Sequence, residues 1–322
     1  MFVEASRGYL SGLFNNHCRR QGIRVFAYHG VVEHKKDPLL ERNLHLIETF
    51  KEHVRLLKRF RIVSLTEIVS DLSTIEKTKA AAAITFDDGY SNNLIACDVL
   101  RNLRWPWTVF VSTGTIGRNT LLWTTELALL LLHGNRRQVE LMGQTWPLVT
   151  RAEREVAFQT IRRKLKLMPS ETRKQTMDVL RSQFPDGEVE SLSQKFPSLQ
   201  MLSWNEVEEL SRNGAEIGSH GVDHEIHHVN QPEDVRLYEL NKSKAQLEAR
   251  LKRPCRFFAF PNGDFTSTSA SEVKSADYSL AFTTQQSTVV SGSDPFSLPR
   301  LNPFSSPRMF TRNLYWEPSQ DQ

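Results

Sequence analysis

The stretch AAAITFDDGY (residues 81–90) decides the fold class of this chain. A short apolar run with Ile84 and Phe86 leads into two adjacent aspartates and a glycine, which is typical of a buried strand followed by a turn. Neighbouring side chains on a strand point to opposite faces, so Asp87 and Asp88 cannot play the same part while the strand continues. A carboxylate pair at the end of a buried strand must meet a cation, a proton or water. The stretch therefore indicates metal binding or acid–base chemistry.

Similar apolar runs recur on both sides of this stretch, and helical patterns separate many of them. The strand-like runs are residues 24–32, 60–65, 81–88, 107–113, 215–220, 256–262 and 279–284, and the helix-like runs are 47–60, 204–214 and 235–251. The pair Asn213-Gly214 is typical of a helix C-terminus. Strands that alternate with helices predict parallel βα units, and hence a doubly wound sheet or a barrel.

Residues 118–200 interrupt this alternation. They contain LLWTTELALLLLHGN and then a basic segment with few strand signals. We expect a single domain over residues 1–322 with a largely helical insertion at 118–200. Two interpretations of the insertion stay open: a lid or substrate-binding surface, or a layer in which residues 127–132 pack on the barrel and the charges face water.

The composition excludes several classes of protein. The chain has 322 residues, enough for a sizeable core, and its net charge of +4 from 41 basic and 37 acidic residues does not suggest a nucleic-acid partner. Three widely spaced cysteines do not suggest a disulfide framework or a zinc ribbon. The sequence has no run of 18 apolar residues, so it does not predict a transmembrane helix. Residues 1–20 lack the pattern of a signal peptide. A cytoplasmic location is the default expectation, and contact of a short N-terminal amphipathic helix with the inner face of a membrane stays open.

A second polar cluster, EIGSHGVDHEIHHVN (216–230), follows another strand-like run. His220 and His224 are four residues apart, which on a helical turn places both imidazoles on one face, as a transition-metal site needs. With one aspartate they form a set of two histidines and a carboxylate, which suits a metal that activates water. Chance spacing is the alternative, and His227 and His228 are either solvent-exposed neighbours or groups that support the ligands.

A third strand end is FFAFPNGDF (257–265), in which Pro261 and Gly263 shape a turn that exposes backbone groups. Together, TFDDGY, SHGVDH and FAFPNG resemble the first three motifs of the polysaccharide deacetylases with a NodB homology domain, carbohydrate esterase family 4. The resemblance runs from residue 24 to residue 302, interrupted by the insertion. It implies a distorted (β/α)7 barrel and a divalent metal, usually zinc, with cobalt or others as alternatives.

The resemblance also implies roles for individual residues. Asp88, His220 and His224 would hold the metal, and Asp87 would be the general base that deprotonates the attacking water. The backbone N–H of Tyr90 is a candidate donor to the oxyanion. Pro261 and Gly263 are grouped with Tyr90 as substrate contacts.

Two departures from the family pattern change these assignments. The third motif commonly carries an arginine that orients the base, and this chain has Ala259 there. Arg300 in SLPRLNP is the candidate replacement. No histidine follows His228, where the family has a late histidine as general acid. The segment VFAYHGVV resembles a branch of the family with an N-terminal Tyr-His segment, so His29 is the candidate acid.

The resemblance implies a metal-dependent hydrolase that removes N-acetyl groups from amino sugars of a bacterial polysaccharide, or of its lipid-linked or nucleotide-linked precursor. One alternative keeps the barrel and changes the bond to an O-acetyl ester or another amide. The other is a catalytically inactive glycan-binding protein. Ala259 and the missing late histidine favour inactivity, and the intact ligand set opposes it.

Overall fold

The structure, a computed structural model, describes residues 22–70, 80–118 and 120–315. Its centre is a parallel sheet in the order β1-β5-β6-β9-β10-β11, with β4 also beside β5. These strands are β1 (Ile23–Tyr28), β4 (Arg61–Ile62), β5 (Ala81–Phe86), β6 (Trp107–Val111), β9 (Ala215–Ser219), β10 (Phe257–Ala259) and β11 (Leu280–Phe282). The later chain bridges β11 at Leu298 and β1 at Leu301, so it links the two edges of the sheet. The distorted (β/α)7 barrel that the sequence predicts is confirmed.

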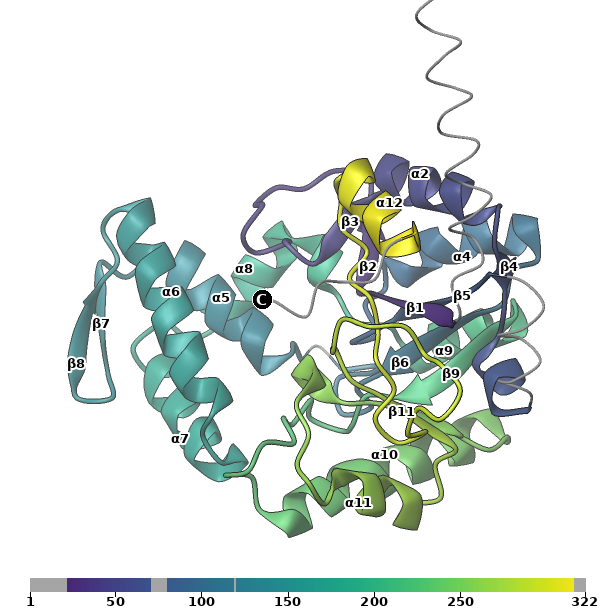
Figure 1. The fold of residues 1–322 in the computed structure, drawn as a ribbon. Helices are drawn as coiled ribbons and strands as arrows, with labels where there is room; N and C mark the ends of the chain where they lie inside the picture. Colours follow the sequence, from purple (N-terminus) through teal and green to yellow (C-terminus); the bar gives the residue numbers. More distant parts are fainter. Residues whose placement is uncertain (1–21, 71–79, 119, 316–322) are drawn as a thin grey trace, which may run out of the picture.

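Helices surround the curled sheet (Figure 1). They are α2 (Ile47–Leu57), α4 (Asn93–Leu103), α9 (Trp204–Arg212), α10 (Glu233–Leu251), α11 (Ser269–Ser275) and α12 (Pro307–Tyr315). Every residue of β5 is buried, as expected for a central parallel strand with both faces covered. The helix end predicted at Asn213-Gly214 is confirmed, because Asn213 caps α9 and Gly214 has a φ of 93°. The expected strand 24–32 divides at His29 into β1 and β2 (Gly30–Val32), and β2 pairs with β3 (Leu44–Leu46).

Residues 118–200 form a group of helices beside the barrel (Figure 1, teal). The elements are α5 (Trp123–His133), β7 (Gln138–Leu141), β8 (Gln144–Pro147), α6 (Arg151–Lys166), α7 (Ser170–Arg181), α8 (Glu188–Lys195) and the short 3-10 helix η1 (Pro197–Leu199). Most of the apolar run 127–132 packs against α6 and α7 in an apolar cluster within this segment, rather than on the barrel. The division of the chain into one domain and an insertion stays a prediction.

A β-hairpin inside this segment was not expected from the sequence. Strands β7 and β8 join through Met142 and Gly143, which both have positive φ, as a two-residue hairpin turn requires. Val139 and Trp146 pair across the hairpin and are both buried. The sequence signal is weak because methionine is an unusual residue at the first turn position.

No helix in the described ranges is long and apolar enough to cross a membrane. The expected amphipathic helix at residues 1–20 lies outside the described residues. Whether it contacts a membrane therefore stays a prediction.

Two buried histidines, His45 and His53, contact Tyr28 of β1 and are expected to make the stability of the fold sensitive to acid. Tyr28 Oη lies 3.1 Å from His53 Nδ1, and the His53 ring stacks on Phe310 with centroids 3.8 Å apart. Burial lowers the pKa of His53 to about 3 and that of His45 to about 4.

Both histidines ionise more readily in the unfolded chain, so the folded state is stable above about pH 6.5 and loses stability as the pH falls toward these lowered values. We expect each histidine to remove about 2 kcal/mol of unfolding free energy between pH 7.5 and pH 5. Urea unfolding at the two pH values measures this change. His53→Phe should reduce the pH dependence, and an unchanged dependence would refute the role of this histidine.

Candidate active site

The carboxyl ends of the parallel strands bring the predicted site residues to one edge of the barrel. Asp87 and Asp88 follow β5, and His220 follows β9. Arg300 lies between the two bridge positions that link β11 to β1. Parallel strands end at the same edge, where α/β barrels place their active sites.

Asp88, His220 and His224 form a buried cluster whose candidate ligand atoms all lie within 4.8 Å of one another. Asp88 Oδ1 lies 3.4 Å from His220 Nε2 and 3.3 Å from His224 Nε2. Ligands about 2.0–2.1 Å from a tetrahedral zinc ion lie about 3.4 Å apart, so these three side chains fit a divalent metal. Asp88 Oδ1 is buried and has no hydrogen-bond partner among the described residues. A bound cation would satisfy this oxygen.

The His220 ring is held in the tautomer that a metal ligand needs. His220 Nδ1 lies 2.7 Å from the carbonyl oxygen of Ala259, and a carbonyl only accepts, so Nδ1 carries the proton. Nε2 is then left as the lone-pair donor that faces Asp88. Ala259 therefore supports the site through its backbone, although it lacks the arginine side chain common in the family.

The loop that carries the histidine pair is not the helical turn that the spacing predicted. Gly221 and His224 have φ values of 81° and 56°, so the chain winds irregularly. The Glu239 carboxylate accepts hydrogen bonds from the backbone N–H groups of Val222, Asp223 and Glu225. Loop hydrogen bonds to a buried side chain, rather than helical periodicity, bring the two imidazoles together.

Asp87 forms a buried, two-pronged ion pair with Arg300. Nη1 and Nη2 of Arg300 each lie 2.7 Å from one carboxylate oxygen of Asp87, and neither residue is more than 3% exposed. Burial raises the pKa of Asp87, but the charge and the hydrogen bonds of Arg300 act in the opposite direction, and the pKa lies below its usual value. Asp87 is ionised at neutral pH and fixed in orientation, as a base must be.

The side chains of Asp87 and Asp88 have different partners because β5 ends at Phe86, before both residues. Asp88 has a φ of 74°, which is uncommon outside glycine, and Gly89 follows with 87°. The expectation that alternation along a strand separates the two carboxylates is therefore wrong. A left-handed turn separates them, and Asp87 meets Arg300 while Asp88 meets the histidines.

His29 and Tyr90 line the same cavity as the two aspartates. His29 is half-buried, and its carbonyl accepts a hydrogen bond from Asn93 Nδ2. The backbone N–H of Tyr90 has no hydrogen-bond partner within the described part of the chain. It is therefore available to a ligand. The assignments of His29 as acid and Tyr90 as oxyanion donor stay predictions.

Pro261 and Gly263 do not line this cavity, whereas Asn262 between them does. All three form the short 3-10 helix η2 (Pro261–Gly263). Gly263 has a φ of 80°, and a Cβ there would lie 2.1 Å from Thr284 Oγ1, so the turn requires glycine. The two residues shape the turn, and their assignment as substrate contacts stays a prediction.

The other histidines of the 216–230 segment lie outside the metal cluster. His227 is fully buried against Phe258 and Phe260, and burial lowers its pKa to about 3. His228 Nε2 lies 3.2 Å from the carbonyl oxygen of Met168. Neither side chain is a ligand in this arrangement.

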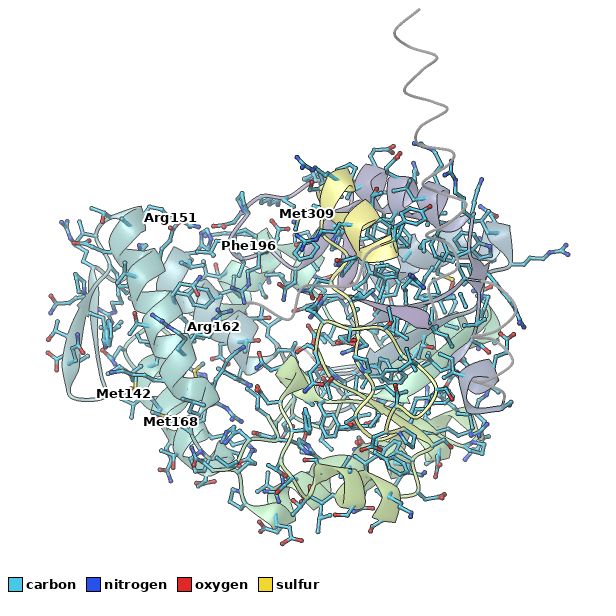
Figure 2. The ribbon with its side chains drawn as sticks, viewed as in Figure 1. Met142, Arg151, Arg162, Met168, Phe196 and Met309 are labelled. Carbon is cyan, nitrogen blue, oxygen red and sulfur yellow. The ribbon has the colours of Figure 1, made fainter. Side chains whose placement is uncertain are left out.

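One wall of the cavity was missed by the sequence analysis. It consists of residues from the 39–44 loop and from α5 and α6, including Phe158, Arg162 and Lys166. Figure 2 labels Arg162 on α6. The sequence showed a basic segment here, but the folded helix decides which of its charges face the site.

A buried carboxylate–histidine cluster beside an ionised carboxylate, at the carboxyl edge of an α/β barrel, is typical of metal-dependent hydrolases. A sequence model described as polysaccharide deacetylase matches residues 74–281. The chain belongs to this family and is a deacetylase enzyme. A search of curated proteins found no match.

Solved structures share the fold. One is the Streptococcus pyogenes deacetylase PplD in complex with acetate, which is 18% identical with a TM-score of 0.56 and aligns 92% of this chain with 99% of that chain. IcaB from Ammonifex degensii is 18% identical with a TM-score of 0.59 over 92% and 97% of the two chains. A de-N-acetylase from Aggregatibacter actinomycetemcomitans is 16% identical with a TM-score of 0.51 over 89% and 99%.

Proposed function

We propose that this deacetylase is metal-dependent and removes N-acetyl groups from amino sugars of a bacterial polysaccharide or its precursor. The observation that supports metal dependence is the buried Asp88–His220–His224 cluster beside the Asp87–Arg300 ion pair. Zinc is the best candidate, because two imidazoles and one carboxylate leave an open position on a tetrahedral ion. The solved de-N-acetylase with this fold supports the choice of an N-acetyl substrate.

The divalent ion, when bound, would polarise the acetyl carbonyl and make water more acidic. Asp87 accepts the proton of the attacking water, because its carboxylate is ionised and held in place. Arg300 keeps that carboxylate aimed through two parallel hydrogen bonds. The pair therefore works as a base and its positioning residue.

The amide bond breaks only if its nitrogen receives a proton, since an amine anion is a poor leaving group. His29 is the candidate donor, because its imidazole lines the cavity with Asp87 and a histidine side chain can act as a general acid. The backbone N–H of Tyr90, which has no hydrogen-bond partner among the described residues, can donate to the oxyanion of the tetrahedral intermediate. A cytoplasmic location rests on the sequence alone and stays a prediction.

The first experiment measures metal content and acetate release together. Wild type should retain about one zinc ion per chain after dialysis and release acetate from N-acetylglucosamine oligomers. Asp88→Asn should lose both, because a neutral amide is a much weaker ligand than a carboxylate. Asp264→Asn, which removes an exposed acid outside the cluster, is the matched control and should keep the metal.

Each outcome has a distinct meaning. Wild type without metal would refute metal dependence. Metal without acetate release from any N-acetylated oligomer, but with release from an O-acetylated sugar, would replace the amide by an ester as the target bond.

A further inference from the structure

The active-site cavity is lined by three cationic side chains in addition to its catalytic groups. Arg42 comes from the loop between β2 and β3, and Arg162 and Lys166 lie one turn apart on α6. Among the described residues that line the cavity, the only acids are Asp87 and Asp88. Arg300 already pairs with Asp87, and the histidines surround Asp88.

None of these three cations forms a salt bridge within the described part of the chain. Arg162 donates to Gln159 Oε1 at 2.9 Å and stacks over the ring of Phe158 at 5.4 Å, while its buried Nε has no partner. Lys166 donates to Asn262 Oδ1. The guanidinium of Arg162 is therefore held in place by neutral groups only.

Some other arginines of the 118–200 segment form ion pairs with carboxylates. Arg151, at the start of the same helix, bonds Asp37 and Glu155, and Arg181 bonds Glu126. Arg154 and Arg163 on α6 donate to backbone carbonyl oxygens instead. Arg162 and Lys166 differ from these arginines because they line the active-site cavity.

The three cations line one cavity with the metal cluster, and the charges of Arg42 and Lys166 act on each other. Burial, and then the charge of Arg42, lowers the pKa of Lys166, while the exposed Asp264 acts in the opposite sense. Like charges that lie close together repel one another, and a bound anion relieves this repulsion.

We propose that the acetylated sugar bound here carries an anionic group, a phosphate or a carboxylate, which Arg42, Arg162 and Lys166 hold beside the catalytic carboxylates. Guanidinium groups form paired hydrogen bonds with both kinds of anion. Such an anchor would fix the position of the sugar relative to Asp87. The inference rests on the proposed function, because it assumes that the acetylated sugar occupies this cavity.

Binding calorimetry on the full chain tests this inference in an Asp87→Asn background, in which turnover should be strongly slowed. The probes are N-acetylglucosamine, N-acetylglucosamine 1-phosphate, and a disaccharide of N-acetylglucosamine and glucuronic acid. At least one acidic probe should bind about tenfold or more tightly than the neutral sugar. The better acidic probe identifies the anion as phosphate or carboxylate, and added salt should weaken its advantage.

Arg162→Gln and Lys166→Gln should each remove most of the advantage. Arg163→Gln is the matched control, because Arg163 is exposed on the same helix and does not line the cavity. Equal affinities for acidic and neutral probes, or no binding of either acidic probe, would overturn the proposal. So would an advantage that survives in both variants.

Acetate release by wild type is followed in parallel. A KM for the acidic substrate that rises in Arg162→Gln, with kcat little changed, supports an anchor and does not depend on the folding of the Asp87→Asn protein. Release without anion preference would leave the proposed function intact and remove the anion site. Preference for the acidic probes without acetate release would support the anion site and contradict the proposed function.

Discussion

Replacing Asp87 with asparagine is expected to lower the rate of acetate release by about 10²–10⁴-fold, the usual contribution of a general base. The amide has nearly the shape of the carboxylate but cannot accept the proton of water. Asp87 is not part of the metal cluster, so the variant should still bind zinc. Steady-state kinetics and metal analysis on the same preparation measure both properties.

The contrast with Asp88→Asn makes this result specific. Asp88→Asn should lose metal and activity together, whereas Asp87→Asn should lose activity and keep the metal, with a lower unfolding free energy because the Arg300 charge loses its partner. If Asp87→Asn also loses its zinc, then Asp87 is a ligand and the division of labour between the two aspartates is wrong. If it keeps near-normal activity, another group is the base.

Replacing Arg300 with methionine is expected to reduce both stability and activity. Removal of one partner of a buried ion pair leaves an uncompensated charge and typically lowers the unfolding free energy by about 3–5 kcal/mol. The pKa of Asp87 should also rise, since the charge of Arg300 helps hold it down. The acidic limb of the pH profile of kcat/KM should therefore move to higher pH.

A double variant separates charge from packing. In Arg300→Met with Asp87→Asn the buried charge is gone, so the double variant should be more stable to urea than Arg300→Met alone. Arg300→Lys keeps a positive charge but loses the paired geometry, and should fall between wild type and Arg300→Met. A double variant no more stable than Arg300→Met would show that packing, not the unpaired carboxylate, causes the loss.

The barrel could be predicted because its signals are local. An apolar run such as 81–86 cannot be a long helix when two aspartates and a glycine follow it, and helical patterns between such runs imply parallel strands. The three motifs at strand ends could likewise be assigned to one site, because parallel strands end at a common edge. The hairpin at Met142-Gly143 was missed, since its turn depends on a positive φ that methionine rarely signals.

The convergence of the site depended on contacts between distant parts of the chain. The sequence suggested Arg300 as the partner of Asp87 only as a replacement for the arginine that the family has in place of Ala259, and Asp87 and Arg300 are 213 positions apart. The loop of His220 and His224 owes its shape to Glu239, a residue that no motif singled out. Hydrogen bonds of this kind have no period in the sequence.

Alone, the sequence determined the strand–helix alternation, the family and the residue types at each strand end, because hydrophobic periodicity and short motifs express local physics. Tertiary structure decided which charges meet. It paired Asp87 with Arg300, turned Asp88 toward two imidazoles through a left-handed turn, and placed Arg162 and Lys166 on the cavity wall. The physical reason is that electrostatic partners are chosen by distance in the folded chain, and that distance exists only once the barrel and the α6 segment have packed together.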